Sequence, residues 1–264
     1  MSAKTDYQTL IVDVDPDAPI MRVTINRPKV LNALNLQVIT ELEEALEAAI
    51  KHKLRVLVIE GAGDKAFVAG ADIAQMLDLS SDDALRFARQ GQRLTQALEE
   101  APLITIAKVQ GYALGGGCEL AMACDLLIAA ESSIFGQPEV DLGLIPGFGG
   151  TQRLVKRVGL PLASAILYGG RKLTGRDAFH CGLVSDVAPK EELETSIQSL
   201  IKAVLKAGPQ AIVETKRLAR MALDIPLNNG LAAEATAFAN CFARPESREG
   251  IQAFLEKRAA RFSE

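Results

Sequence analysis

Two glutamates, Glu119 and Glu139, stand in glycine-rich surroundings of the kind that reaction sites use. Glu119 follows the run Gly115-Gly116-Gly117 at the start of an apolar helical stretch, and Glu139 comes 20 residues later in a loop bounded by Gly and Pro. Glycines at a helix start let a ligand oxygen approach bare backbone N–H groups, where the helix dipole is positive. Two carboxylates beside such a position indicate acid/base chemistry next to a stabilised oxyanion.

Each glutamate also has a purely structural interpretation. An acid in the first turn of a helix can simply complement the helix dipole, which stabilises the helix by a few tenths of a kcal/mol to about 1 kcal/mol. That role does not require three preceding glycines, and a carboxylate on a buried helix without a basic partner is costly, so Glu119 is a site candidate. Glu139 alone resembles a solvated loop acid, but apolar neighbours favour a half-buried position. These neighbours are Phe135, Val140, Leu142 and Leu144.

Other motifs are weak or absent. The four cysteines form no Cys-x-x-Cys pair, so neither a zinc site nor a disulfide framework is expected. Cys118 adjoins Glu119, but no histidine is near it in sequence, and we interpret it as a small buried side chain. Gly61-Ala62-Gly63 lacks the third glycine of a dinucleotide fingerprint. The backbone at Gly70-Ala71 could offer a second N–H group to a bound oxygen.

The composition limits the class of protein. A chain of 264 residues with 48% hydrophobic and 23% charged residues suits one large globular domain, or a core with an appendage. The net charge of −4 gives no basic field for nucleic acid or an anionic membrane. No apolar run reaches the roughly 18 residues of a membrane span, and the N-terminal residues lack a signal-peptide segment. We therefore expect a cytoplasmic protein with no nucleic-acid and no membrane partner.

The order of elements predicts an α/β fold. Apolar runs of strand length alternate with helical periodicity, which favours right-handed β-x-α units and buried parallel strands. After about residue 190 only helices are expected. The predicted strands are 10–12, 21–25, 55–60, 103–109 and 126–130, and the predicted helices are 36–51, 82–100, 117–124, 192–207, 209–223, 229–243 and 246–262.

Taken together, motifs along nearly the whole chain resemble the crotonase (enoyl-CoA hydratase/isomerase) superfamily. The motifs are Asn26-Arg27-Pro28, Leu31-Asn32-Ala33-Leu34, Ala69-Gly70-Ala71-Asp72, Gly111 to Glu119, Gly136-Gln137-Pro138-Glu139, Pro146 to Leu154, and Gly250 to Arg258. The resemblance implies a ClpP-like spiral of β-β-α units. It also implies a catalytic core over residues 1–200, a helical trimerisation region over residues 201–264, and a homohexamer built as a dimer of trimers.

The resemblance also implies a reaction and a set of site residues. The family binds acyl-CoA thioesters and holds the thioester oxygen between two N–H groups, which correspond here to Ala71 and Gly116. In hydratases two glutamates hold one water, and we assign Glu119 mainly to the water that attacks C3 and Glu139 to the proton given to C2. No metal and no separate cofactor are expected, because coenzyme A is part of the substrate. Further substrate contacts are expected at Lys29, Leu31, Ala69, Asp72, Ile73, Gly147, Phe254 and Lys257.

The resemblance implies that Phe254 and Lys257 reach the nucleotide of an adjacent subunit. They are three residues apart, so on a helix they would share a face. Lys29 and Lys257 would meet the phosphates. Acyl-chain preference should depend on the segment from Ala74 to Gln90.

Several alternatives stay open from the sequence. An enoyl-CoA isomerase is the nearest one, although dienoyl-CoA isomerases carry an acid at the position of Gly147 and 3,2-enoyl-CoA isomerases often lack the earlier glutamate. A hydratase of a branched or aromatic enoyl-CoA would use the same two glutamates. A noncatalytic RNA- or CoA-binding protein is the alternative from another class, which the acidic balance and the intact glutamate pair disfavour.

Overall fold

A computed structural model describes residues 7–262 of the chain. The N-terminal residues considered above for a signal peptide lie almost entirely outside this part. The chain divides into two compact units, Met1–Ile197 and Gln198–Glu264. No helix in the described range is both long and apolar enough to cross a membrane.

The larger sheet of the N-terminal unit has six strands in the order β1-β2-β3-β5-β7-β10. β1 is antiparallel to β2, and all other neighbours are parallel. All five strands predicted from sequence lie in this sheet, and only β10 was not foreseen. The strands are β1 (Leu10–Val14), β2 (Ile20–Ile25), β3 (Val56–Gly61), β5 (Ile104–Val109), β7 (Leu126–Ala130) and β10 (Asp186–Ala188).

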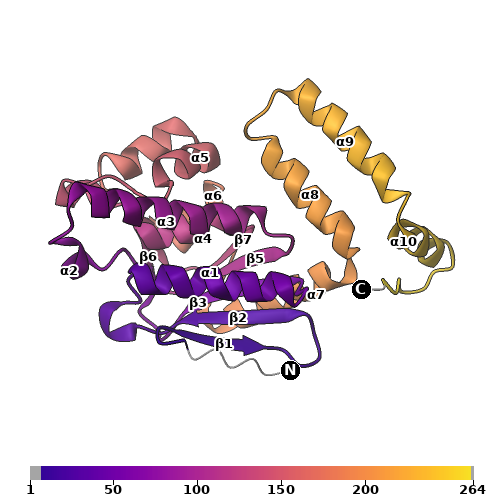
Figure 1. The fold of residues 1–264 in the computed structure, drawn as a ribbon, viewed down its shortest axis with the longest axis horizontal. Helices are drawn as coiled ribbons and strands as arrows, with labels where there is room; N and C mark the ends of the chain where they lie inside the picture. The colour runs from indigo at the N-terminus through magenta and orange to yellow at the C-terminus, as the bar shows by residue number, and fades with distance from the viewer. Residues whose placement is uncertain (1–6, 263–264) are drawn as a thin grey trace. The chain divides into compact units, whose positions relative to one another are not determined.

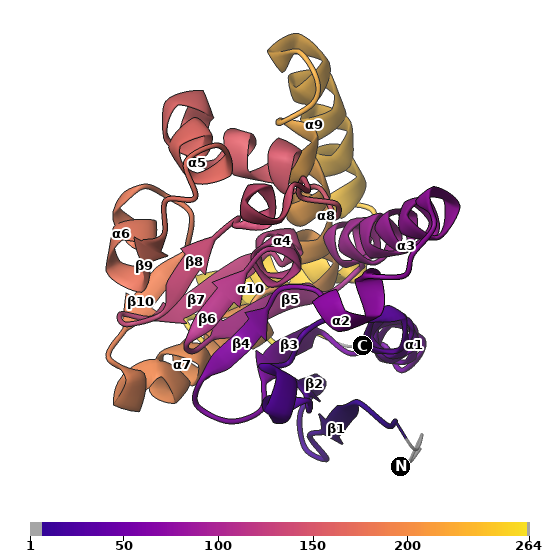
Figure 2. The same ribbon diagram turned by 90° about the vertical axis from the view of Figure 1, so that its left-hand side faces the viewer.

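A second sheet of four short strands, in the order β4-β6-β8-β9, was not predicted. Its strands have two to four residues, which is too short for a periodic signal. β4, β6 and β8 each follow soon after β3, β5 and β7, and a helical segment comes next (Figure 2). This is the spiral of β-β-α units that the family resemblance implies. The strands are β4 (Ala66–Ala69), β6 (Tyr112–Leu114), β8 (Ile134–Gly136) and β9 (Leu173–Thr174).

Helices cover the sheets of this unit. α1 and α3 run side by side (Figure 1), and α4 is buried along its whole length. α5 contains a kink at Gly159, where φ is 75°. The helices are α1 (Leu36–Lys51), α2 (Ile73–Met76), α3 (Ser81–Glu100), α4 (Gly116–Ala123), α5 (Gly150–Leu167), α6 (Gly175–His180), η1 (Pro28–Val30), η2 (Glu139–Leu142) and η3 (Lys190–Glu192), and α7 (Leu193–Lys206) begins in this unit and ends in the other.

Strand alternation in β2 separates the apolar core from a cluster of charges. Met21, Val23 and Ile25 point into the core, while Arg22 on the opposite face pairs with Glu194 at 2.5 Å. On the same face, the Lys108 ammonium lies 2.7 Å from Glu194 and also contacts Glu60. These charges neutralise one another, so the cluster is structural.

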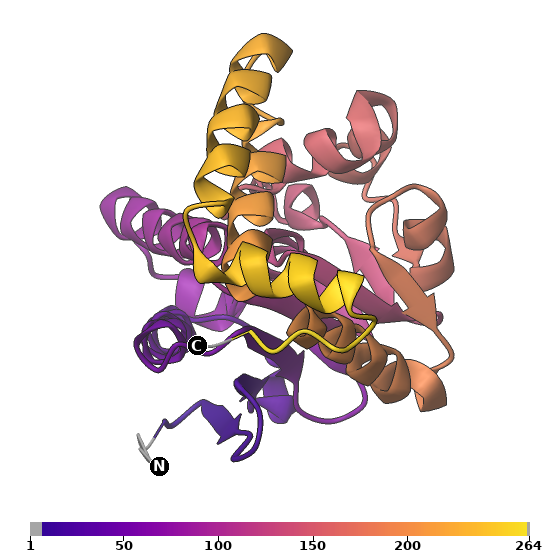
Figure 3. The same cartoon turned by 90° about the vertical axis from the view of Figure 1, so that its right-hand side faces the viewer.

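The C-terminal unit is helical. α8 and α9 lie side by side (Figures 1 and 3). The Glu246 carboxylate accepts hydrogen bonds from the N–H groups of Gln210 at 3.1 Å and Ala211 at 3.0 Å, at the start of α8. The helices are α8 (Pro209–Met221), α9 (Leu227–Cys241) and α10 (Pro245–Leu255).

The prediction of a helix to Phe262 was wrong, because α10 ends at Leu255. Lys257 adopts a left-handed conformation with φ of 54°. Its N–H donates to Phe254 O at 3.2 Å, and Arg258 N–H donates to Ala253 O at 3.0 Å. These two bonds form a Schellman motif, which ends a helix. Glycine usually takes this position, so a lysine there gives no stop signal in the sequence.

Asn32 fixes the segment that leads into α1. Its side chain is 1% exposed, and its amide donates to Ala62 O at 3.0 Å and Ala66 O at 2.9 Å. Its carbonyl oxygen accepts from Arg27 N–H at 3.0 Å. Asn32 also has φ of 59°, a conformation that asparagine tolerates better than most residues. One side chain therefore ties the loop to β4.

We expect Asn32→Ala to lower the free energy of unfolding by about 2 kcal/mol or more, because buried carbonyl and N–H groups lose their partner. Urea denaturation would measure the change. The control is Asn26→Ala at an exposed position, where we expect a change within about 0.5 kcal/mol. Equal stabilities of the two variants would contradict this role of Asn32.

Candidate active site

Two structural features explain why glycines precede Glu119. Gly115 has φ of 51° and ψ of −127° just before α4, a backbone conformation open mainly to glycine. A Cβ on Gly117 would lie 2.1 Å from Val68 O, so only glycine lets α4 approach β4 this closely. The run thus brings the start of a buried helix against the second sheet and carries Glu119 with it.

The Glu119 side chain is 1% exposed. Its Oε1 accepts hydrogen bonds from Phe148 N–H at 2.8 Å and Gly150 N–H at 2.6 Å. Burial raises the pKa of Glu119, while the N–H groups of Gly150, Phe148 and Gly147 and the charge of Arg153 act in the opposite direction. The two short N–H bonds suit a carboxylate that acts as a base.

Glu139 begins η2 and is half-buried. The pKa of Glu139 is raised to about 7, mainly by burial and also by the charge of Glu119, while its own N–H group acts in the opposite direction. A carboxyl group with this pKa carries a proton in a large fraction of molecules at neutral pH, so it can act as a general acid. Burial raises the pKa of both carboxyl groups, and the two differ in their hydrogen-bond partners.

Gln137 lies between the two carboxylates. It is 1% exposed, and its amide, oriented by its neighbours, donates to the Glu139 oxygens at 2.9 Å and 3.1 Å. A Cβ on Gly150 would lie 2.7 Å from the other atom of the Gln137 side-chain amide and 2.9 Å from Glu119 Oε1. Sequence reasoning gave Gln137 no role. The sequence feature that could have indicated a role for Gln137 is a polar side chain between the apolar strand β8 and Pro138-Glu139.

The two candidate oxyanion donors follow neighbouring strands. Ala69 pairs with Leu114 in register, and a Cβ on Gly115 would lie 3.6 Å from Gly70 Cα. Leu34 bonds to the residues on either side of Ala71, since its N–H donates to Gly70 O and its carbonyl accepts from Asp72 N–H. In a parallel bridge the N–H of the middle residue, Ala71, points away from Leu34.

The Gly116 N–H is at the first position of α4, where no carbonyl of the same helix is available. Ala71 and Gly116 thus stay the predicted donors, each at the chain segment that directly follows one of two paired strands.

Most predicted substrate residues of the N-terminal unit lie on two adjacent segments, residues 28–34 and 69–73, which we call the strip. Ala69 N–H donates to Leu31 O at 3.0 Å, which joins residues 28–34 to residues 69–73. Asp72 forms an ion pair with Arg27 at 2.8 Å, so its carboxylate links its own segment to the chain just before Pro28. Lys29 and Ile73 are exposed on the strip, and Gly147 lies in the loop that binds Glu119.

Phe254 and Lys257 belong to the C-terminal unit. Phe254 is 82% exposed, and Lys257 is exposed beyond the end of α10. The argument that they share a helix face was wrong, because the helix ends before Lys257.

Two other features do not provide reactive groups. Cys118 is fully buried, and burial raises the pKa of its thiol to about 12, so no thiolate nucleophile forms there. No group of three or more His, Cys, Asp or Glu residues within 7–262 could hold a metal ion.

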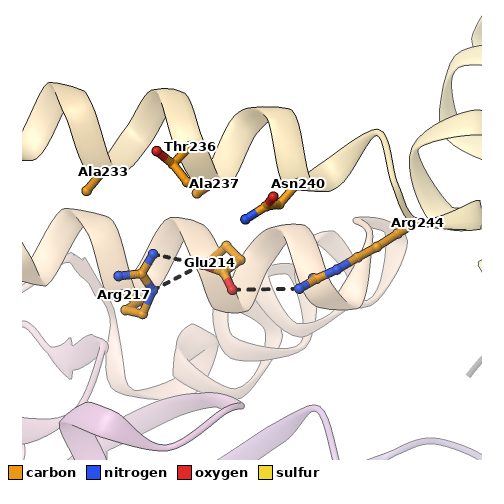
Figure 4. A pocket seen from close by; sticks show the side chains of 7 residues that line it. All are labelled: Glu214, Arg217, Ala233, Thr236, Ala237, Asn240 and Arg244. Atoms are coloured by element: carbon orange, nitrogen blue, oxygen red, sulfur yellow. Dashed lines mark hydrogen bonds and ion pairs between the residues drawn. The ribbon is translucent and has the colours of Figure 1, made fainter.

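A hollow of about 420 Å³ lies between α8 and α9 (Figure 4). Its charged side chains face one another, since Glu214 contacts Arg217 at 3.0 Å and Arg244 at 3.9 Å. The hollow therefore lacks the carboxylate pair of the site above.

We expect Gly150→Ala to reduce turnover at least about tenfold, because the new Cβ would displace Glu119 or Gln137 and sub-ångström placement matters to catalysis. Steady-state kinetics would measure the loss. Gly230→Ala is the control, since a Cβ there would meet only Ile225 at 3.9 Å. Normal turnover of a folded Gly150→Ala variant would contradict the packing described for this site.

Comparison with known proteins places these residues in a family. The model of the enoyl-CoA hydratase/isomerase family matches residues 15–264. The crotonyl-CoA hydratase of Syntrophomonas wolfei is 42% identical, with 97% of this chain and 98% of the relative covered. The short-chain-enoyl-CoA hydratase of Clostridium acetobutylicum is 36% identical, with 94% and 95% covered.

Solved structures agree in fold. An enoyl-CoA hydratase from Bacillus anthracis superimposes with a TM-score of 0.92 at 33% identity, covering 97% of this chain and 99% of that chain. Pseudomonas aeruginosa DspI gives a TM-score of 0.94 at 31% identity, covering 99% and 100%. With its motifs, its spiral fold and its paired glutamates, the chain belongs to the enoyl-CoA hydratase/isomerase family.

Proposed function

We propose that this protein adds water across the 2,3 double bond of a 2-enoyl-CoA to give a 3-hydroxyacyl-CoA. The observation that carries the proposal is the pair Glu119 and Glu139, one held by backbone N–H groups and the other with a pKa near 7. The relatives named for crotonyl-CoA and short-chain enoyl-CoA hydration favour a short acyl chain. Such a reaction serves fatty-acid oxidation and related degradations.

In the proposed reaction the two carboxyl groups share the work on one water. The Glu119 carboxylate takes a proton from the water while the water oxygen forms a bond to C3. The electron pair of the double bond moves toward the thioester, and C2 then takes the proton of Glu139. Afterwards Glu119 holds a proton and Glu139 is ionised, so one proton moves within the pair to restore the starting state.

Negative charge develops on the thioester oxygen as water adds. We propose that the N–H groups of Ala71 and Gly116 bind this oxygen. Fixed donors of this kind stabilise the transition state without reorganisation, and loss of one costs about 3–4 kcal/mol in other enzymes. The reaction as proposed needs no metal and no cofactor, because the thioester of coenzyme A itself provides the electron sink.

We further propose that coenzyme A lies along the strip that carries Lys29, Leu31, Ala69, Asp72 and Ile73. Lys29 is exposed there and can meet a phosphate as a point charge. Residues 201–264 would form the trimerisation region of a homohexamer. There Phe254 and Lys257 would contribute to the nucleotide site of a neighbouring subunit, by stacking and by charge.

A direct assay tests the proposal. With crotonyl-CoA as substrate, we expect the enoyl absorbance to fall in the presence of the protein. Glu119→Gln and Glu139→Gln should each reduce turnover at least about 100-fold, with little change in acyl-CoA affinity, because both groups act mainly in the transition state. Movement of the double bond without hydration would indicate an isomerase instead. Unchanged turnover in either variant would remove that glutamate from the mechanism.

The pH dependence should report the shared proton. The raised pKa of Glu139 means that the proton stays bound at lower pH and is lost as pH rises through about 7. We therefore expect kcat/KM to fall above an apparent pKa near 7. Hydration consumes no net proton, so kcat/KM for dehydration of 3-hydroxybutyryl-CoA should fall over the same pH range. Retention of this fall in Glu139→Gln would assign it to another group.

A further inference from the structure

The position of Glu119 depends on a loop that reaches it from elsewhere in the chain. The two N–H groups that bind Oε1 belong to Phe148, in the loop before α5, and Gly150, the first residue of α5. These residues are 29 and 31 positions from Glu119. Whatever fixes the loop therefore fixes the carboxylate.

Phe148 is held by α3 through its ring. A Cβ on Gly91 would lie only 2.2 Å from Cδ1 and 2.5 Å from Cγ of this ring, so the ring occupies the space that a side chain would need. Phe87, one turn earlier on α3, meets the ring edge-on at a centroid distance of 5.1 Å. A Cβ on Gly116 would lie 3.3 Å from the other side of the ring, so the ring also contacts the start of α4.

The carbonyl of Phe148 is held as well. It accepts hydrogen bonds from Thr95 Oγ1 at 3.2 Å and from Arg153 Nη1 at 2.7 Å. Arg153 in turn forms a bidentate ion pair with Glu99, at 2.8 Å and 2.7 Å. Both side chains of this pair are mostly buried, with 14% and 23% exposure, so the pair is poorly screened and its geometry is well defined.

Three of these anchors lie on one face of α3. Gly91, Thr95 and Glu99 are spaced four residues apart, so they stack along the helix. Gly91 receives the ring of Phe148, Thr95 binds its carbonyl directly, and Glu99 binds it through Arg153. The face is thus complementary to one residue of the loop that carries the N–H donors.

We propose that this face of α3, formed by Gly91, Thr95 and Glu99, positions the Glu119 carboxylate by fixing Phe148. The inference rests on the proposed hydration, and the three are positioning residues because they act through the loop. Arg153 adds a favourable charge near Glu119, and this charge is oriented by the same pair with Glu99. A shift of the loop would lengthen the two N–H bonds and leave a buried carboxylate poorly stabilised.

Kinetics with matched controls test the proposal. We expect Gly91→Ala, Thr95→Val and Glu99→Gln each to reduce kcat at least about tenfold, with KM for crotonyl-CoA changed less than about twofold. The controls are Glu100→Gln, an exposed acid next to Glu99, and Gln96→Ala, an exposed residue next to Thr95. Both controls should retain wild-type kcat. Wild-type kcat in folded Thr95→Val and Glu99→Gln would overturn the proposal.

A double-mutant cycle separates positioning from general destabilisation. If Glu99 acts through Glu119, adding Glu99→Gln to Glu119→Gln should change the residual kcat less than about twofold. An undiminished tenfold loss in that background would overturn the proposal. The cycle uses thermal unfolding of all variants to exclude loss of folded protein.

A titration of Glu119 in the free protein, followed by carbon NMR, gives a readout independent of activity. Weaker N–H bonds should raise the pKa of Glu119 in Glu99→Gln and Gly91→Ala but leave it unchanged in Glu100→Gln. No difference among these variants would overturn the proposal. A wild-type protein that fails to hydrate crotonyl-CoA would instead count against the proposed function, and the titration would still decide on the role of α3.

Discussion

The burial of one carboxylate is the constraint on which the rest of the site depends. A carboxylate in apolar surroundings is tolerated only with good hydrogen bonds, and Glu119 obtains them from two backbone N–H groups at 2.8 Å and 2.6 Å. Backbone donors cannot rotate away, so the loop around Phe148 must be held rigidly. The φ of 105° at Gly149, a conformation open mainly to glycine, lets the N–H groups before and after it converge on one oxygen.

The second carboxyl group, that of Glu139, is held differently. Glu139 is only half-buried, and the Gln137 side-chain amide binds it where Glu119 has backbone N–H groups. Its pKa is raised to about 7, and in the proposed reaction it is the acid while Glu119, with its two N–H bonds, is the base. Gln137 donates to Glu139, and both Gln137 and Glu119 lie within 3 Å of the position that a Cβ on Gly150 would occupy.

The two-sheet spiral explains why these groups meet. The buried strands β3, β5 and β7 are each followed by a short strand, and β4 and β6 bring Gly70 and Gly115 close together. The segments after them carry the two candidate oxyanion donors and the helix of Glu119. Both sheets contribute side chains to the apolar core, and the segments that directly follow β4 and β6 carry the two candidate donors.

The sequence by itself determined five of the six strands of the larger sheet and helices such as α1 and α3, and it predicted a site at Glu119 and Glu139. Apolar periodicity and glycines at a helix start are local patterns, so these features follow from neighbouring residues. The tertiary structure decided the short second sheet, the end of α10 before Lys257, and the partners of the carboxylates. Phe148 meets Glu119 across 29 positions of sequence, and Gln137 comes to lie beside both carboxylates only because β8 and the loop before α5 converge there. Such contacts depend on the path of the whole chain, and no local pattern encodes them.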